Sequence, residues 1–137
     1  MKPIAIIFSA LLISGCSTPV DDLINNKFAE VVAKPVKDQY IGVWTGSTGP
    51  WLTTMSIKKN GTGIYCSSWA QRNFTGSLKV VDDVVNYQDG AKLQIALVEG
   101  GLVGNYVGKG HSDTQYKFMH DPVLKEASPY CKTEMSR

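Results

Sequence analysis

The stretch that decides the fold is WLTTMSIKKNGTGIYCSSW, residues 51–69. Its first half alternates apolar or large side chains with small polar or basic ones, a period of two that is typical of a β-strand with one buried face. Asn60-Gly61 follows, and this dipeptide favours a two-residue hairpin turn because both residues tolerate positive φ angles. Such a turn pairs Met55 with Cys66, so the sequence predicts that Cys66 faces the core.

The period of two continues to residue 118 and predicts eight strands, from residues 40–46 to residues 114–118. Asp82-Asp83 is expected to form a two-residue turn, and Glu99-Gly100 another. Asp89-Gly90 fits the apolar pattern of its neighbours only within a three-residue loop.

These turns fix the pairing of the later strands. They place Leu78 opposite Tyr87, and they place Ile95 opposite the small Gly104.

Eight sequential antiparallel strands with no helix between them favour an all-β fold, a small up-and-down barrel. A β-sandwich is the alternative. Strands of about seven residues make a barrel narrow enough for its side chains to fill. We therefore expect no roomy ligand cavity.

The N-terminal segment has the three parts of a secretory signal: the basic Lys2, an apolar run over residues 4–13, and the small pair Ser14-Gly15. Residues 12–16 resemble the lipobox of bacterial lipoproteins. The resemblance implies diacylglycerol on Cys16 and cleavage after Gly15. The alternative is that Cys16 is an ordinary residue of a secreted protein.

These features divide the chain into a cleaved signal peptide (1–15), a lipidated tether or short helix (16–39) and a β domain with a C-terminal tail (40–137). In enterobacterial lipoproteins an Asp after the acylated Cys favours the inner membrane, so Ser17 at this place makes the outer membrane the expected location. A helix over residues 20–31 is suggested by apolar residues at helical spacing.

The charge balance gives little reason to expect a charged partner. The formal net charge is +2, and loss of Lys2 with the signal peptide leaves +1. Since nucleic-acid binding depends on clustered basic residues, a nearly neutral chain argues against a nucleic acid as partner.

If Cys16 carries lipid, two cysteines remain, Cys66 and Cys131. In an oxidising compartment two remaining thiols usually form a disulfide. This bridge would close a loop of about 65 residues and stabilise the fold by about 4 kcal/mol. Two unrelated free thiols are the alternative, and a metal site is disfavoured because the spacing lacks CxxC.

No catalytic motif emerges from the chain. His111-Ser112-Asp113 contains the residue types of a catalytic triad, but neighbours in sequence cannot adopt its geometry, and the one other histidine is His120. The segment 104–109 lacks the glycine and hydroxyl positions of a phosphate-binding loop. We therefore expect no enzyme, no cofactor and no metal.

Two family resemblances add to this interpretation. Gly42-Val43-Trp44 is similar to the G-x-W that begins lipocalins, in which the Trp plugs one end of the barrel. The chain also resembles the YedD-like family of small outer-membrane lipoproteins, which implies an outer-membrane lipoprotein of unassigned activity. The matching features are the lipobox, this G-x-W, Gly49-Pro50, Cys66-Ser67-Ser68-Trp69, the segment 78–83 and Cys131.

Three functions remain open. The first is a non-catalytic binding module in the envelope, held at the outer membrane by the lipid on Cys16, with Tyr65 and Trp69 exposed on the outer face to meet a periplasmic protein or a glycan. The second is an enzyme inhibitor, because residues 106–110 resemble a segment of membrane-bound lysozyme inhibitors and Lys109 would enter the acidic cleft. The third is a lipocalin-like carrier of a small apolar ligand, which requires a cavity.

Overall fold

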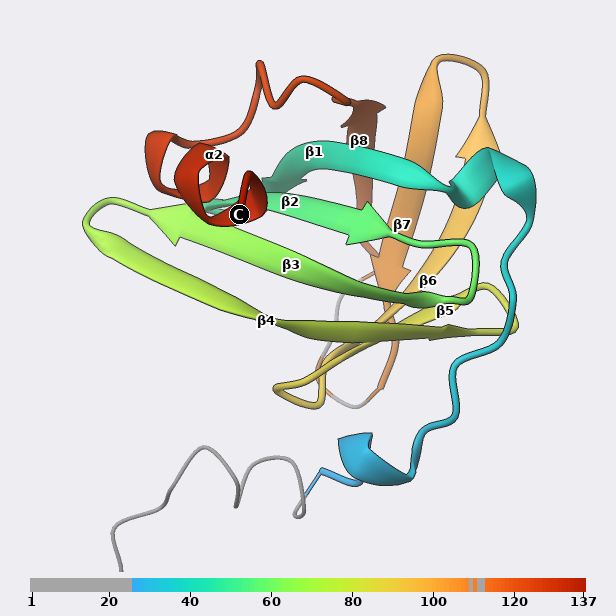
Figure 1. The fold of residues 1–137 in the computed structure, drawn as a ribbon. Helices are drawn as coiled ribbons and strands as arrows, with labels where there is room; N and C mark the ends of the chain where they lie inside the picture. The colour runs from blue at the N-terminus through green and yellow to red at the C-terminus, as the bar shows by residue number, and fades with distance from the viewer. Residues whose placement is uncertain (1–25, 109, 111–112) are drawn as a thin grey trace, which may run out of the picture.

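The computed structural model describes residues 26–108, 110 and 113–137. In this part of the chain eight antiparallel strands form one closed barrel, in which each strand pairs with its neighbours in sequence and β8 closes on β1 (Figure 1). The predicted up-and-down barrel is confirmed. The strands are β1 (Gly42–Thr48), β2 (Trp51–Ile57), β3 (Thr62–Trp69), β4 (Arg72–Val81), β5 (Val84–Tyr87), β6 (Lys92–Val98), β7 (Gly101–Tyr106) and β8 (Gln115–His120).

The predicted pairing of the later strands is confirmed. Leu78 lies opposite Tyr87 across the turn at Asp82 and Asp83, whose φ angles of 49° and 64° are those of a tight hairpin turn. The next loop has three residues, since the Tyr87 amide donates to the Ala91 carbonyl.

Ile95 lies opposite Gly104, as predicted. A Cβ at Gly104 would lie 2.8 Å from the side chain of Leu93. The barrel interior therefore needs a glycine at this position.

The predicted register of the β2–β3 hairpin is wrong by one residue. The Lys58 amide donates to the Thr62 carbonyl, so the loop has three residues, with Gly61 last at a φ of 81°. The Asn60 side chain accepts hydrogen bonds from the amide and the hydroxyl of Thr62 and stabilises this wider loop. Glycine at the end of a three-residue loop is an ordinary hairpin solution, which the sequence pattern does not distinguish from a two-residue turn.

The shift moves every side chain of β3 to the other face. Met55 pairs with Tyr65, which points into the barrel, and Cys66 pairs with Thr54 on the outer wall. The predictions of a core-facing Cys66 and an outward Tyr65 are therefore wrong. The ring of Tyr65 lies over Gly76, where a Cβ would come within 2.6 Å of it. The missing side chain at Gly76 makes room for the ring.

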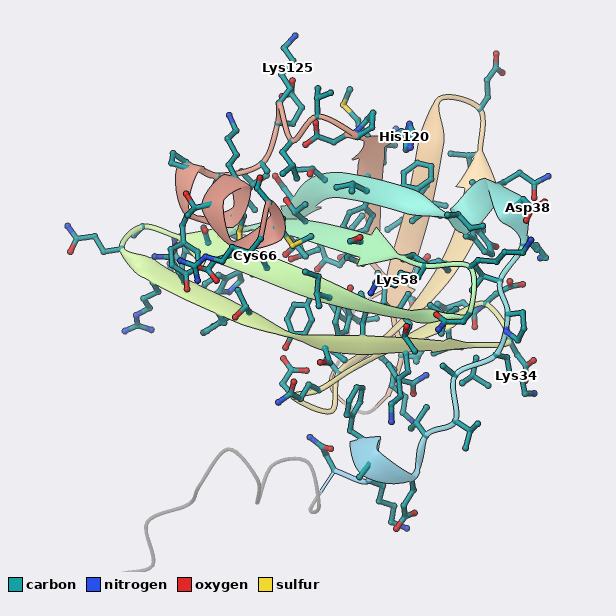
Figure 2. All side chains as sticks on the ribbon, in the orientation of Figure 1. Lys34, Asp38, Lys58, Cys66, His120 and Lys125 are labelled. Carbon is teal, nitrogen blue, oxygen red and sulfur yellow. A yellow bond between two sulfur atoms is a disulfide. The ribbon has the colours of Figure 1, made fainter. Side chains whose placement is uncertain are left out.

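A C-terminal helix, α2 (Pro129–Met135), packs on the outer wall against β3 (Figure 1). Ser128 caps its N-terminus by accepting a hydrogen bond from the Cys131 amide, and proline follows at the first helical position. The predicted disulfide between Cys66 and Cys131 is present, with a Cα–Cα distance of 5.6 Å, and Figure 2 shows Cys66 beside α2. Cys66 is thus fully buried although it lies outside the barrel.

Asp121 anchors the start of the C-terminal segment. Its carboxylate is buried and accepts hydrogen bonds from the Thr45 hydroxyl at 2.9 Å and from the amides of Lys125 and Glu126. Thr45 in turn hydrogen-bonds Thr54. This network satisfies polar side chains that the C-terminal segment covers.

Residues 26–41 run along the barrel as a strap and contain two short 3-10 helices, η1 (Phe28–Glu30) and η2 (Asp38–Tyr40). The Lys34 amide donates to the Val80 carbonyl, and the Val36 amide donates to the Lys59 carbonyl. From residue 26 onward the expected helix over residues 20–31 is reduced to the single turn η1. Its residues 20–25 lie outside the described part.

Candidate functional site

The two ends of the barrel differ, and Trp44 closes one of them. Its side chain is buried, its Nε1 donates to the Tyr40 carbonyl at 3.0 Å, and its ring lies 5.1 Å from that of His120. Trp44 thus occupies the plugging position that the lipocalin resemblance implies.

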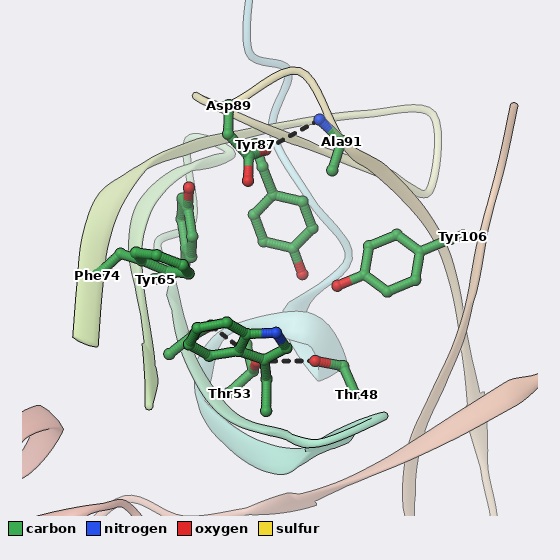
Figure 3. Close-up of a pocket in the computed structure, with 10 residues that line it drawn as sticks. Thr48, Thr53, Tyr65, Phe74, Tyr87, Asp89, Ala91 and Tyr106 are labelled. Carbon is green, nitrogen blue, oxygen red and sulfur yellow. Dashed lines mark hydrogen bonds between the residues drawn. The ribbon is translucent and has the colours of Figure 1, made fainter. Parts of the chain in front are cut away.

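The other end, the mouth, holds a hollow of about 130 Å³ (Figure 3). Side chains from six strands and the β5–β6 loop converge on it, so no short segment of sequence contains the site. They are Thr48 of β1, Trp51 and Thr53 of β2, Tyr65 and Ser67 of β3, Phe74 of β4, Tyr87 of β5, Asp89 and Ala91 of the loop and Tyr106 of β7.

Three tyrosines form the floor of the mouth hollow. The rings of Tyr65 and Tyr87 meet edge to face with centroids 4.7 Å apart, and Tyr106 lies 6.3 Å from Tyr87. In Figure 3 the hydroxyls of Tyr87 and Tyr106 point into the same space. The Tyr87 hydroxyl also donates to Met55 Sδ at 2.9 Å.

The floor tyrosines stay protonated. Burial raises the pKa of Tyr65 well above its usual range, and the negative charge of Asp89 raises it further. Burial likewise raises the pKa of Tyr87 and of Tyr106. All three are neutral phenols at ordinary pH, with hydroxyls that can donate or accept.

Hydroxyl groups line one wall of the mouth hollow. Thr53 Oγ1 lies 3.0 Å from Thr48 Oγ1 and 2.8 Å from Ser67 Oγ, which makes a continuous hydrogen-bonded row. All three residues are buried. The wall is therefore polar and already ordered.

Three aromatic side chains form the rim: Trp51, Trp69 and Phe74. The centroid of Trp51 lies 4.6 Å from that of Phe74 and 5.4 Å from that of Trp69. Trp69 is 45% exposed and Phe74 is 49% exposed. Large aromatic side chains held together at this exposure are typical of binding surfaces.

Asp89 supplies the one charge among the described lining residues. Its Oδ1 accepts a hydrogen bond from the Ala91 amide at 2.9 Å, and this bond fixes the carboxylate above the tyrosines (Figure 3). The lining residues include no Lys, Arg or His in the part of the chain that the structure describes. The lining of the mouth hollow therefore carries a net negative charge.

The structure changes the predicted binding surface of Tyr65, Trp69 and Lys109. Tyr65 is 7% exposed and lines the hollow, whereas Trp69 stands on the rim against Trp51. Lys109 and the lipidation residue Cys16 lie outside the described residues.

Sequence reasoning missed Phe74, Tyr87, Asp89 and Tyr106 as site residues. The signal was present in the inward positions of the strands, but only the closed barrel brings these positions together.

Within the described ranges no group of His, Cys, Asp and Glu is placed to hold a metal ion. None of the helices described there has the length and apolar character needed to cross a bilayer.

A family model described as "Bacterial lipocalin LPS transport optimiser YedD" matches residues 25–135. The solved structure of the lipoprotein YedD from Klebsiella pneumoniae subsp. pneumoniae MGH 78578 has the same fold, with a TM-score of 0.50 and 13% sequence identity over 80% of this chain and 92% of that chain. A comparison with curated proteins finds no match. Because the family model spans most of the sequence, this chain belongs to the YedD family of lipocalin-like bacterial lipoproteins.

Proposed function

We propose that the protein is a lipoprotein of the outer membrane, anchored through Cys16, whose barrel faces the periplasm and acts as a non-catalytic binding module that assists LPS transport. The observation that carries the proposal is the family match over residues 25–135, since that family is described as an LPS transport optimiser. The mouth supplies the binding surface.

The construction of the mouth supports binding. Exposed aromatic side chains on the rim, next to the hydroxyl groups of the wall and the floor, offer apolar contact and hydrogen bonds at the same place. At the closed end, main-chain hydrogen bonds hold the strap against the barrel. Among the described residues this end has no group of exposed aromatic side chains beside buried hydroxyl groups.

The size of the mouth hollow argues against a carrier of whole lipids. Pockets that enclose drug-sized ligands have volumes of about 300–1,000 Å³. At about 130 Å³ the hollow admits only a small group, so the barrel assists transport as a binding partner and does not enclose a lipid. The inhibitor alternative depends on Lys109, and no described residue adds to it.

The location rests on two residues of the N-terminal segment. Cys16 ends the lipobox, and Ser17 follows it where an Asp would favour the inner membrane. Attachment to the outer membrane would raise the local concentration of the barrel there, so that a weak contact suffices.

The test is complementation in the host with the native gene deleted, measured as the rate at which newly made LPS reaches the cell surface. We expect deletion to slow this rate and the wild-type gene to restore it. Ser17→Asp keeps the lipidated Cys16 and moves the protein to the inner membrane, so it should fail to restore the rate. Cys16→Ser removes the lipid and should fail as well.

Membrane fractionation is the control, and each variant must reach the wild-type protein level. An unchanged LPS rate in the deletion strain would contradict a role in LPS transport. Full rescue by Ser17→Asp located at the inner membrane would contradict the proposed site of action.

A further inference from the structure

We propose that the mouth hollow binds a small organic cation, with the ammonium group beside Asp89 and among the aromatic side chains. This inference rests on the proposed function, because it assumes that the barrel acts by binding. It adds the chemical class of the ligand.

The charge of the mouth hollow selects a cation. Asp89 is the one charged group among the described lining residues, and the Ala91 amide holds its carboxylate in place. The three tyrosine hydroxyls and the hydroxyls of Thr48, Thr53 and Ser67 add oxygen atoms and no positive charge. A phosphate or a carboxylate would meet repulsion from Asp89 with no basic lining residue described to offset it.

The aromatic residues that line the mouth hollow suit an ammonium group. Five of the ten lining residues are aromatic: Trp51, Tyr65, Phe74, Tyr87 and Tyr106. Aromatic faces attract cations, and groups of aromatic side chains are the usual recognition device for quaternary ammonium ligands. A neutral apolar ligand would gain nothing from the charge of Asp89.

The volume distinguishes the cation from a sugar ring. An engineered cavity of about 150 Å³ admits benzene, which has six heavy atoms. The mouth hollow has about 130 Å³ and takes a group of similar size. A trimethylammonium or ethylammonium group fits within this limit, whereas a hexose, with about twice the heavy atoms of benzene, would remain largely outside.

The experiment is calorimetric titration of the full-length lipoprotein in a non-ionic detergent with choline. The matched neutral probe is 3,3-dimethylbutan-1-ol, which replaces the charged nitrogen of choline with carbon. We expect choline to bind with a Kd of about 1 mM and the neutral alcohol to bind at least about tenfold more weakly.

The variants locate the site. Asp89→Asn removes the charge and retains an oxygen for the Ala91 amide, and it should weaken choline binding about tenfold. Asp82→Asn makes the same change in the β4–β5 turn, at the closed end, and should leave binding unchanged. Phe74→Leu should weaken binding about threefold while the protein stays folded, because Phe74 is half exposed.

Two further probes identify the source of the ammonium group. Tighter binding of ethanolamine than of glycerophosphoethanolamine would assign a free amine, and the reverse order would assign a phospholipid headgroup. Either order supports the cation site.

Equal binding of choline and the neutral alcohol would overturn the proposal, and so would unchanged affinity in Asp89→Asn or no heat of binding up to about 50 mM choline. These results would not touch the proposed function, because the Ser17→Asp experiment is read from LPS transport and needs no ligand.

Discussion

The two ends of this barrel are built from the same eight strands but have different chemistry. At the closed end Trp44, Ile57 and Val80 are all at most 5% exposed, and Tyr40 of the strap packs with them in one core cluster. Main-chain hydrogen bonds hold the strap to the barrel at this end. At the mouth, Trp69 and Phe74 are nearly half exposed above a polar floor. On this difference we propose that the closed end supplies stability and the mouth supplies binding.

The largest effect on stability is expected from loss of the disulfide that joins α2 to the outer wall of β3. Replacing both members of the disulfide, Cys66→Ala with Cys131→Ala, removes a cross-link across 65 residues and should lower the free energy of unfolding by about 4 kcal/mol. Urea unfolding of the variant and the wild type measures the change. A loss below about 1 kcal/mol would mean that α2 holds its place through packing alone.

The second-largest loss of stability is expected from a substitution at the closed end. Ile57→Ala truncates a side chain that is 2% exposed and should cost about 3 kcal/mol by the same measurement. The folded variant should keep its mouth intact. In a Trp44→Phe background, in which Trp51 and Trp69 are the remaining tryptophans, this is visible as unchanged fluorescence. A cost near that of a surface substitution, about 0.5 kcal/mol, would contradict the contrast between the two ends.

The sequence allowed the barrel to be predicted, and three of the four predicted registers are confirmed, for physical reasons that differ from strand to strand. Asp82-Asp83 and Glu99-Gly100 leave one loop length that keeps the apolar faces matched, and both predicted pairings are confirmed. Asn60-Gly61 permits two loop lengths with acceptable faces, because both faces of β3 mix apolar and polar residues. Ile64, Cys66 and Ser68 lie on one face, and Tyr65, Ser67 and Trp69 lie on the other. In the observed register Tyr65 lies over Gly76 of β4, a contact that the hairpin segment alone does not contain.

The site residues were missed for the same reason: their proximity depends on contacts between strands that are far apart in the sequence. Asp89 reads in the sequence as a turn residue, and Phe74 and Tyr106 read as inward strand residues. Only closure of β8 on β1 makes them neighbours. The start of α2 can be predicted from the sequence, because Ser128-Pro129 is an N-cap followed by a proline at the first helical position. The disulfide then fixes where the helix packs.

Substitutions at the mouth should have the smallest effect on stability and the clearest effect on function. Trp69→Ala with Phe74→Ala removes two half-exposed rings and should cost about 1 kcal/mol of folding stability. Lys34→Ala with Lys37→Ala is the matched control on the strap, since both lysines are exposed and form surface ion pairs with Asp82 and Asp83.

The most direct test of binding at the mouth is the rate at which newly made LPS reaches the surface of cells carrying either double variant at the wild-type protein level. We expect the Trp69→Ala, Phe74→Ala protein to slow the rate as much as gene deletion does, and the Lys34→Ala, Lys37→Ala protein to restore the wild-type rate. A wild-type rate with the mouth variant, or a rate lowered equally by both variants, would contradict the assignment of function to the mouth.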